Sequence, residues 1–332
     1  MNLFQDYFLA AAGDDRDMTS LIEEKLNTFG ICILGAGDFY TNGIRMPQHS
    51  QLMGLGDCSR LFLKEEIEEG HALRLGSFCT VKGLWLIGNK TDLGRPSSVG
   101  TRHGIGFLGT ATTQDWSGQD RNCILESLRI TSFTGGGIHC HDTGYSTSCC
   151  MVASDIHITS CGVGIFISRY SEYHRFTNIH CTGNHYGCVN NGGNNVFSAC
   201  SFDSNVVGFL MDNSQGQSPN NSHGSVVGCT FNHTDSNKGV GIMALNTRCG
   251  FVFSACQIFY SDIVLENTLN FQFVNFNGGK DVHITAKGAS CTAFSECFFD
   301  NHPIFDIKEC DSFFVRECYT KKGDKILCPN EK

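Results

Sequence analysis

The sequence predicts an all-β protein, a right-handed parallel β-helix in which short strands stack coil upon coil. The first observation is a recurring frame, "FSAC" at 197–200, "FSAC" at 253–256 and "FSEC" at 294–297. The second is a period of two in the apolar residues around each frame, which is typical of β-strands. The third is composition: 38 Gly, 26 Phe and only 17% charged residues fit many short strands joined by turns.

The frame extends along the C-terminal half of the chain, from residue 154 to residue 323. A second alternating strand lies between successive frames, such as "VGIFISR" at 163–169 and "VGFLMDN" at 207–213. Each unit is too small to bury its own apolar face, so stacked units must share one continuous core. Equivalent side chains then lie about 4.8 Å apart on successive coils. The expected inward positions are Ile156, Ile179, Cys200, Cys229, Cys256, Val274, Cys297 and Cys318.

Residues 1–30 are expected to form an N-terminal capping segment with a helix near 18–29. Thr19 or Ser20 fits an N-cap, Glu23 stands at capping-box spacing from Ser20, and Gly30 fits the end of the helix. A helix there would cover the open first coil, whose unpaired strand would otherwise invite aggregation. Its expected apolar face consists of Ile22, Leu26 and Phe29.

Residues 31–332 are expected to form a single β-helix domain with an inserted loop at 89–121. Solenoids often place binding residues in such insertions. Trp116 lies in this segment among polar residues, and we expect it to be a platform on which a sugar ring stacks. A packed indole that anchors the loop is the alternative.

Charge and cysteine content indicate which classes of partner, metal site and cell compartment to expect. The net charge is −9 and no Lys/Arg cluster is present, which disfavours nucleic acid and favours a neutral or cationic partner or a polyol. The 19 Cys fall mostly at alternating apolar positions, so we expect reduced, buried thiols and neither a metal site nor a cofactor. No apolar run spans a membrane, and the N-terminus lacks a positive region before its apolar run. These features favour a cytoplasmic protein, with secretion as the alternative.

Three segments near the start carry a family resemblance. They are "ILGAGDFYTNGIRMP" (33–47), "SQLMGLGDCSRLFL" (50–63) and "VKGLWLIGN" (81–89). Together with the repeats they resemble the pectin-lyase-like β-helix superfamily, which includes polysaccharide lyases, glycoside hydrolases, inulin fructotransferases and phage tailspikes. The resemblance implies a carbohydrate ligand. The paired-Asp signature of polygalacturonases and the Asp cluster of calcium-dependent pectate lyases are both missing, so the member family stays open.

An outward row of apolar residues is expected on the second strand of successive coils. An exposed apolar stripe on a solenoid face is typical of an interface. Because cyclic trimers are common in the resembled families, we expect a homotrimer, with loops folded over the stripe as the alternative. The stripe consists of Phe166, Val189, Leu210, Met243 and Val264.

A polar row beside this stripe supplies the predicted catalytic acids. Asp212 and Glu266 lie two coils apart, roughly 10 Å between backbones. Their carboxyl groups could reach the separation of roughly 6.5–9.5 Å that inverting glycosidases use. Asp203 and Asp142 are the reserve candidates. The non-catalytic alternative is that these residues are ordinary solvated acids.

The other sheet carries a second cluster. Arg129, His157 and His180 are expected at outward positions of successive coils, where imidazole and guanidinium groups could bind and break a glycosidic linkage. Stacked surface histidines are more often structural. The expected substrate-binding residues are Trp116, His141, His157, His180, Arg169 and Asn191.

The leading functional hypothesis is therefore a carbohydrate-active enzyme, a glycoside hydrolase or fructotransferase-like protein that uses acid/base carboxylates. The alternatives are a non-catalytic glycan-binding spike or receptor-binding module, and a polysaccharide lyase. An enzyme should bring groups with perturbed pKa values together in one cleft. A binding module should instead present aromatic platforms.

Overall fold

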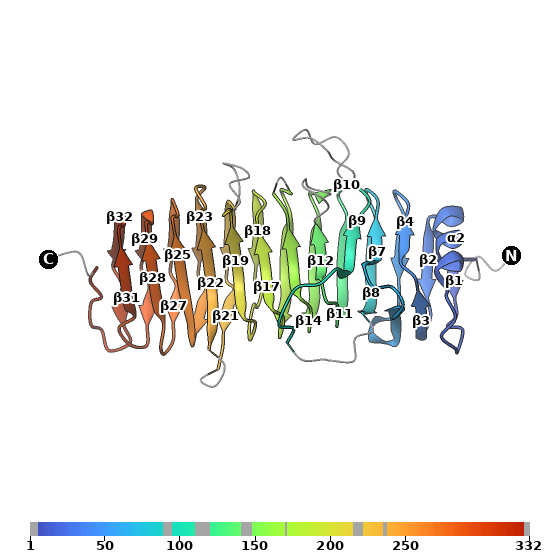
Figure 1. The fold of residues 1–332 in the computed structure, drawn as a ribbon, viewed down its shortest axis with the longest axis horizontal. Helices are drawn as coiled ribbons and strands as arrows, with labels where there is room; N and C mark the ends of the chain where they lie inside the picture. The colour runs from blue at the N-terminus through green and yellow to red at the C-terminus, as the bar shows by residue number, and fades with distance from the viewer. Residues whose placement is uncertain are drawn as a thin grey trace.

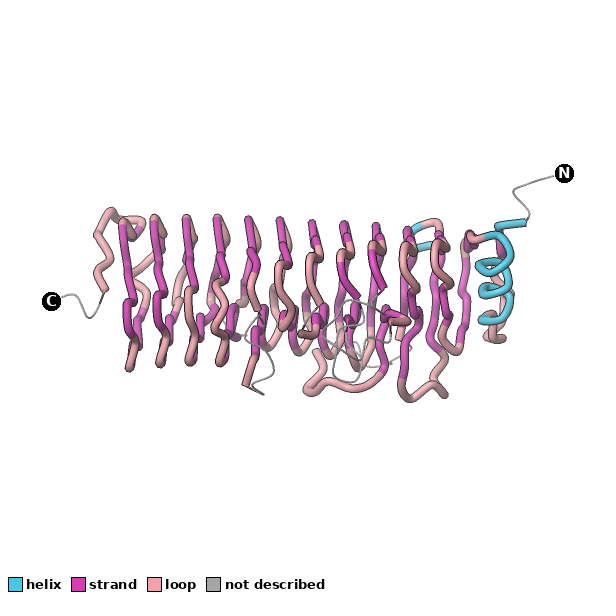
Figure 2. The backbone as a smooth tube through the Cα atoms, turned by 90° about the horizontal axis from the view of Figure 1, so that it is seen from above, coloured by secondary structure: helices cyan, strands magenta, loops and turns pink. Residues whose placement is uncertain are grey.

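The computed structural model describes residues 6–88, 95–109, 120–140, 148–169, 171–214, 222–234 and 238–328. In this part of the chain the parallel strands form an elongated solenoid with the two termini at opposite ends (Figure 1). Successive coils lie side by side with little change in size (Figure 2). The predicted parallel β-helix is confirmed.

Two long sheets form the faces of the solenoid, and we call them sheet A and sheet B. Among the described residues sheet A has 15 strands and sheet B has 11. Sheet A contains β1 (Phe8–Leu9), β2 (Ile31–Leu34), β3 (Gly37–Thr41), β5 (Gln51–Met53), β6 (Ser59–Leu63), β8 (Thr80–Ile87), β11 (Ile124–Thr131), β14 (Val152–Thr159), β16 (Arg175–Thr182), β18 (Asn195–Ser198), β20 (Gly224–Val227), β23 (Phe251–Ser254), β26 (Phe271–Val274), β29 (Ser290–Ser295) and β32 (Asp311–Arg316). Sheet B contains β4 (Ile44–Met46), β7 (Gly70–Leu75), β9 (Arg102–Phe107), β12 (Gly136–Cys140), β15 (Val163–Ile167), β17 (Tyr186–Asn190), β19 (Val207–Asp212), β22 (Gly239–Leu245), β25 (Ser261–Glu266), β28 (His283–Lys287) and β31 (Ile304–Lys308).

Shorter elements complete the coils. A five-stranded sheet lies beside sheet A in the later coils. One further pair of short strands links two successive turns. The five strands are β21 (Thr230–Asn232), β24 (Gln257–Phe259), β27 (Asn277–Gly278), β30 (Phe298–Phe299) and β33 (Tyr319–Thr320). The pair is β10 (Asp120–Arg121) with β13 (Ser148–Cys149), and the helical elements are α2 (Thr19–Phe29) and the 3₁₀ turn η1 (Gly56–Cys58).

The sequence predicted one inserted loop at 89–121, and this prediction was wrong. The segment contains β9, which pairs with β7 and β12 inside sheet B. The segment reads as a loop because β9 is rich in glycine and histidine, "RHGIGF", and only Ile105 and Phe107 supply apolar side chains. The parts at 89–94 and 110–119 lie outside the described residues.

The core consists of columns of side chains that repeat from coil to coil. Phe253, Phe273 and Phe294 pair in register and are fully buried. Their rings stack almost parallel, with centroids 5.1 Å and 4.4 Å apart. The expected column of Ile156, Ile179 and successive cysteines is present, and all 19 cysteines are free, most of them buried.

One position in that column was predicted wrongly. Phe276, not Val274, points inward beside Cys256, because Ser254 pairs with Val274 and Gln257 pairs with Asn277. Phe276 is fully buried. Asn275 lies between the two candidates with φ of 51°. Ala255 and Glu296 adopt the same conformation at the equivalent positions of the neighbouring coils, so Phe276 takes the place of the frame's cysteine.

The same left-handed position recurs on neighbouring coils of sheet A. Ser127, Asp155 and Asn178 have φ between 53° and 56° and interrupt the register of β11, β14 and β16. Asp and Asn adopt this conformation more readily than most residues, because their short polar side chains hydrogen-bond locally. The kink aligns these three residues in a column beside the row that contains His157, and this column becomes one wall of the groove described below.

The predicted helix is present as α2, and it lies at the N-terminal end of the solenoid (Figure 2). Gly30 ends it with φ of 71°, as expected. The expected capping box is absent, because Asp17 accepts the Thr19 amide (2.9 Å) and Glu23 accepts the Arg45 amide (2.7 Å). Among the described residues no helix is long and apolar enough to cross a membrane.

The packing of α2 makes its capping role testable. Leu26 is 1% exposed and Leu21 of the same helix is 45% exposed. Leu26→Asp would bury a charge against β2 and β4, so we expect a loss of several kcal/mol and exposure of the first coil. Thermal unfolding and light scattering should show a lower Tm and aggregation. Leu21→Asp is the matched control, and equal behaviour of both variants would contradict a capping role.

Candidate functional site

Asp212 and Glu266 lie in one row on the outer side of sheet B. Asp212 pairs in register with Leu245, which in turn pairs with Glu266. The two acids are therefore two coils apart, as the sequence predicts. The half-buried Leu245 occupies the same row between them. An apolar side chain thus separates the two carboxyl groups.

Asp212 also closes the turn that follows β19. Its Oδ1 accepts hydrogen bonds from the Ser214 amide (2.7 Å) and from the Ser214 hydroxyl. Its own amide donates to Oδ1 of Asn191 (2.9 Å), so the structure brings these two predicted site residues together. This bonding accounts for the position of Asp212 without a ligand, and its catalytic role stays a prediction.

Asp203, a reserve candidate, lies beside the five-stranded sheet rather than beside Asp212. Its carboxylate accepts hydrogen bonds from the Asn232 amide (2.7 Å), the Thr230 hydroxyl (3.2 Å) and the Ser201 hydroxyl. These bonds tie two coils together. Trp116, His141 and Asp142 lie outside the described residues, and Arg169 is half-buried just after β15.

A shallow groove of about 510 Å³ runs over the outer face of sheet A, and we call it the histidine groove. It brings the predicted His157 and His180 together. Its lining residues are Asp57, Ser127, Leu128, Arg129, Asp155, Ile156, His157, Asn178 and His180.

The floor of the groove follows from the strand register. Trp85 of β8 pairs with Arg129 of β11, Arg129 pairs with His157 of β14, and His157 pairs with His180 of β16. Parallel in-register strands place equivalent side chains about 4.8 Å apart on one face. Four coils therefore contribute an indole, a guanidinium group and two imidazoles in a single line.

Arg129 is held in place from two sides. Its guanidinium carbon lies 4.1 Å from the centre of the Trp85 ring, and its Nη1 lies 3.5 Å from Oδ2 of Asp57. Trp85 Nε1 donates to Thr131 Oγ1 (2.9 Å), which fixes the indole. Arg129 Nε is shielded from solvent and has no hydrogen-bond partner in the described part of the chain. Because the ion pair with Asp57 is exposed, an incoming ligand can compete for it.

His157 lies in this line between Arg129 and His180. Partial burial, Arg129 and His180 all hold the pKa of His157 below its usual value. The His157 and His180 rings lie edge to face with centroids 6.3 Å apart. Beside them, Asn178 Nδ2 donates to Oδ1 of Asp155 (2.7 Å). At neutral pH His157 is therefore a free base, available to accept a proton from a ligand.

The sequence did not identify Asp57 as a groove residue, nor Trp85 as the ring on which Arg129 stacks. Trp85 had a usable signal, because "VKGLWLIG" repeats the alternation of "LESLRIT" with the indole in the place of Arg129. Asp57 had no usable signal in the sequence, since η1 belongs to a turn two coils before the strand of Arg129.

The predicted apolar stripe exists as a row on sheet B. Phe166, Val189, Leu210, Met243 and Val264 pair in register one after another. Val189 and Leu210 are only 5% and 8% exposed, so within the single chain they are already covered. This leaves a smaller apolar surface for association than the sequence suggested. The homotrimer stays a prediction, which light scattering of the purified protein would test.

Comparisons with known proteins agree with this architecture. No family model matches the sequence, and no curated protein matches it. Among solved structures, the A-module of mannuronan C-5 epimerase AlgE6 from Azotobacter vinelandii superposes with a TM-score of 0.58 at 16% identity, covering 93% of this chain and 97% of that one. The Dettilon tailspike protein gp208 gives a TM-score of 0.62 at 12% identity, covering 94% of this chain and 69% of that one.

A glycoside hydrolase has the same fold. The catalytic unit of the GH87 alpha-1,3-glucanase from Streptomyces thermodiastaticus strain HF3-3 gives a TM-score of 0.56 at 15% identity, covering 92% of this chain and 67% of that one. At such identities the likeness establishes the fold alone. The chain therefore has the parallel β-helix fold of these proteins.

Proposed function

We propose that the protein is a carbohydrate-active enzyme that binds an oligo- or polysaccharide across the histidine groove. The observation that carries the proposal is the line from Arg129 to His180, in which a free-base imidazole lies beside a guanidinium group on an open, nearly straight surface. An extended glycan fits such a surface, because its sugar units can lie along the row of coils.

The chemistry of the groove suits proton transfer. His157 acts as the general base, and His180 on the next coil is placed to return a proton. Arg129 binds an anionic or strongly polar group of the sugar and displaces Asp57 from its exposed ion pair. A base beside a guanidinium group favours abstraction of a proton next to a sugar carboxylate, the chemistry of a lyase or an epimerase.

The folds that resemble this chain support a glycan as the ligand. Their names describe a mannuronan C-5 epimerase, an alpha-1,3-glucanase and phage tailspikes. The net charge of −9 argues against a long polyanion over most of the surface. We therefore expect Arg129 and the two imidazoles to contact a short acidic stretch rather than an extended acidic polymer.

A second candidate is cleavage or transfer of a glycosidic bond by Asp212 and Glu266, in a glycoside hydrolase or fructotransferase-like reaction. The observation that favours it is the row of sheet B in which the two acids lie two coils apart, with Asn191 bonded to Asp212. A hydrolase would act on neutral glycans, which the net charge permits.

A glycan panel separates these candidates. Purified protein is incubated with neutral and uronate-containing oligosaccharides, and the products are read by mass spectrometry and ultraviolet absorbance. On the best substrate we expect His157→Gln to lose at least about a hundredfold in rate, since a general base contributes that much or more. Gln257→Ala is the matched control. Gln257 is exposed and belongs to the five-stranded sheet, which continues the rows of sheet A.

The outcomes are distinct. Full activity in His157→Gln with loss in Asp212→Asn would overturn the groove and favour the second candidate. Saturable binding without turnover of any glycan would instead identify a non-catalytic binding module.

A further inference from the structure

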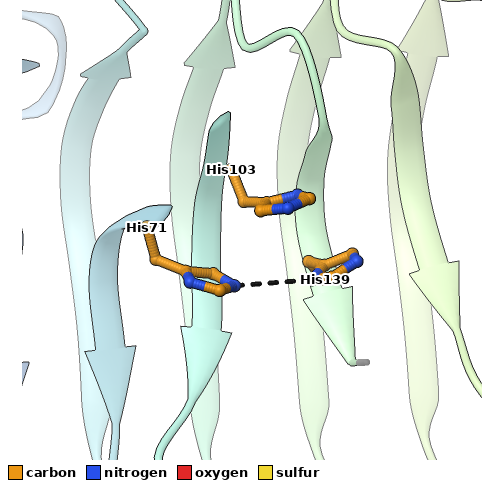
Figure 3. Close-up of side chains that lie close together, drawn as sticks. All are labelled: His71, His103 and His139. Carbon is orange, nitrogen blue, oxygen red and sulfur yellow. Dashed lines mark hydrogen bonds between the residues drawn. The ribbon is translucent and has the colours of Figure 1, made fainter. Parts of the chain in front are cut away.

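Three histidines converge on the outer face of sheet B, away from the histidine groove. His71 belongs to β7, His103 to β9 and His139 to β12, which are successive strands of the sheet. Figure 3 shows the three imidazoles gathered over these strands. One ring nitrogen of each lies within 4.8 Å of the others. His103 is buried, and the other two are half-buried.

Glycines on the neighbouring strands make this convergence possible. A Cβ added at Gly106 would lie 2.2 Å from Cδ2 and 2.4 Å from Nε2 of His71. A Cβ added at Gly135 would lie 2.3 Å from Nδ1 of His103. His71 and His103 therefore each lean onto the next coil through space that only glycine leaves open, and the three rings meet instead of standing apart on their own strands.

The spacing of two of the nitrogens matches that of metal ligands. Nε2 of His71 lies 3.4 Å from Nδ1 of His139 (Figure 3). Two imidazole nitrogens that each lie about 2.0–2.1 Å from a tetrahedral zinc ion are about 3.3–3.4 Å apart. Without a metal ion, a proton on one of the two nitrogens joins them.

We propose that His71, His103 and His139 bind a first-row divalent metal ion of the zinc, nickel or copper class. Imidazole is a preferred ligand of these ions, and three histidines with an open fourth position are a known zinc donor set. Three neutral ligands leave the full positive charge on the ion. The open position would then bind water or an anionic group of a ligand. The site does not depend on the function proposed for the groove.

Metal binding requires one rearrangement. The His103 and His139 rings stack with centroids 3.7 Å apart and an angle of 14° between their planes. Lone pairs in nearly parallel planes do not meet at one ion. In addition, Nδ1 of His103 accepts a hydrogen bond from the Gly136 amide (2.8 Å). His103 must therefore turn out of the stack, release the Gly136 amide and supply its Nε2 nitrogen.

The test titrates Zn²⁺ and Co²⁺ into the full chain after chelator treatment and dialysis, with calorimetry and absorbance as readouts. We expect one equivalent of metal to bind, with Co²⁺ spectra that lack the thiolate charge-transfer band of cysteine ligation. His139→Ala should weaken binding at least tenfold. Gly106→Ala keeps all three imidazoles but fills the space of His71, and it should weaken binding as well.

His283→Ala is the matched control, because His283 is an exposed histidine of β28 in the same sheet. It should bind like the wild type. Equal binding by His139→Ala and the wild type, a thiolate band, or no saturable binding would overturn the proposal. Circular dichroism of each variant shows whether the fold is intact, and Gly106→Ala tests the site without removing a ligand.

The amide of Gly136 reports on His103 separately. Its NMR signal should shift when Zn²⁺ binds, because the bond to Nδ1 of His103 is lost. A signal that stays in place while one equivalent binds would show that His103 is not a ligand, which would overturn the three-histidine site.

Discussion

Replacing Phe273 by alanine should lower the free energy of unfolding by about 3–5 kcal/mol. Phe273 is fully buried in the centre of the phenylalanine column. Its ring stacks on Phe253 and Phe294 and meets Phe276 edge to face with centroids 5.5 Å apart. The neighbouring coils are held by their own hydrogen bonds and can collapse only partly into the resulting cavity, so most of the lost packing is not recovered.

Urea denaturation followed by circular dichroism measures this loss. Phe298→Ala is the matched control, because Phe298 is 51% exposed and should cost little. Because a solenoid can unfold in parts, hydrogen exchange of β26 and β29 should also accelerate in the Phe273 variant. Similar losses in the two variants would mean that the column does not stabilise the core as described.

Acid should destabilise the protein through His174. This residue is fully buried, with Nδ1 accepting the Met151 amide (3.1 Å) and Nε2 bonded to the Ser171 hydroxyl (2.7 Å). Burial, and then Arg175, lowers the pKa of His174 from the usual 6.5 to about 3. The unfolded chain takes up a proton below about pH 6.5, whereas the folded chain resists it down to about pH 3. Stability is therefore complete above pH 6.5 and falls as the pH drops through this window.

The size of the stability loss follows from the pKa shift of His174. At about 1.4 kcal/mol for each pKa unit, the loss at pH 3 is on the order of 4 kcal/mol. His174→Gln keeps an acceptor for the Met151 amide and a donor for Ser171 but does not titrate. Urea denaturation from pH 7 to pH 4 should show a steeper decline for the wild type than for this variant. Parallel declines would show that His174 does not cause the acid sensitivity.

The repeating features could be predicted from the sequence because they are local. The Phe-Ser-x-Cys frame fixes which residues of each coil face inward, and the stripe from Phe166 to Val264 has the predicted register. Val274 was misassigned because Phe276 takes the place of the frame's cysteine in this coil, so the column was continued at the wrong residue of "FVNF". The burial of Leu210 depends on how tightly neighbouring side chains such as Val189 and Val207 pack around it, which periodicity does not report.

The site was predicted only in part, because only some of its residues stand in aligned repeats. His157 and His180 stand in aligned repeats, so their proximity follows from the frame. The three-histidine cluster was missed because His71 and His103 precede the clear repeats, and only the glycines beside them bring the rings together. Asp57 reaches the groove through a turn whose path depends on tertiary structure.

The most direct test of the central proposal is a crystal structure of the protein with the oligosaccharide selected by the panel. The proposal predicts sugar units along sheet A over Arg129, His157 and His180, with Arg129 bonded to a sugar oxygen and no longer to Asp57. Sugar units bound instead on sheet B beside Asp212 and Glu266 would contradict it.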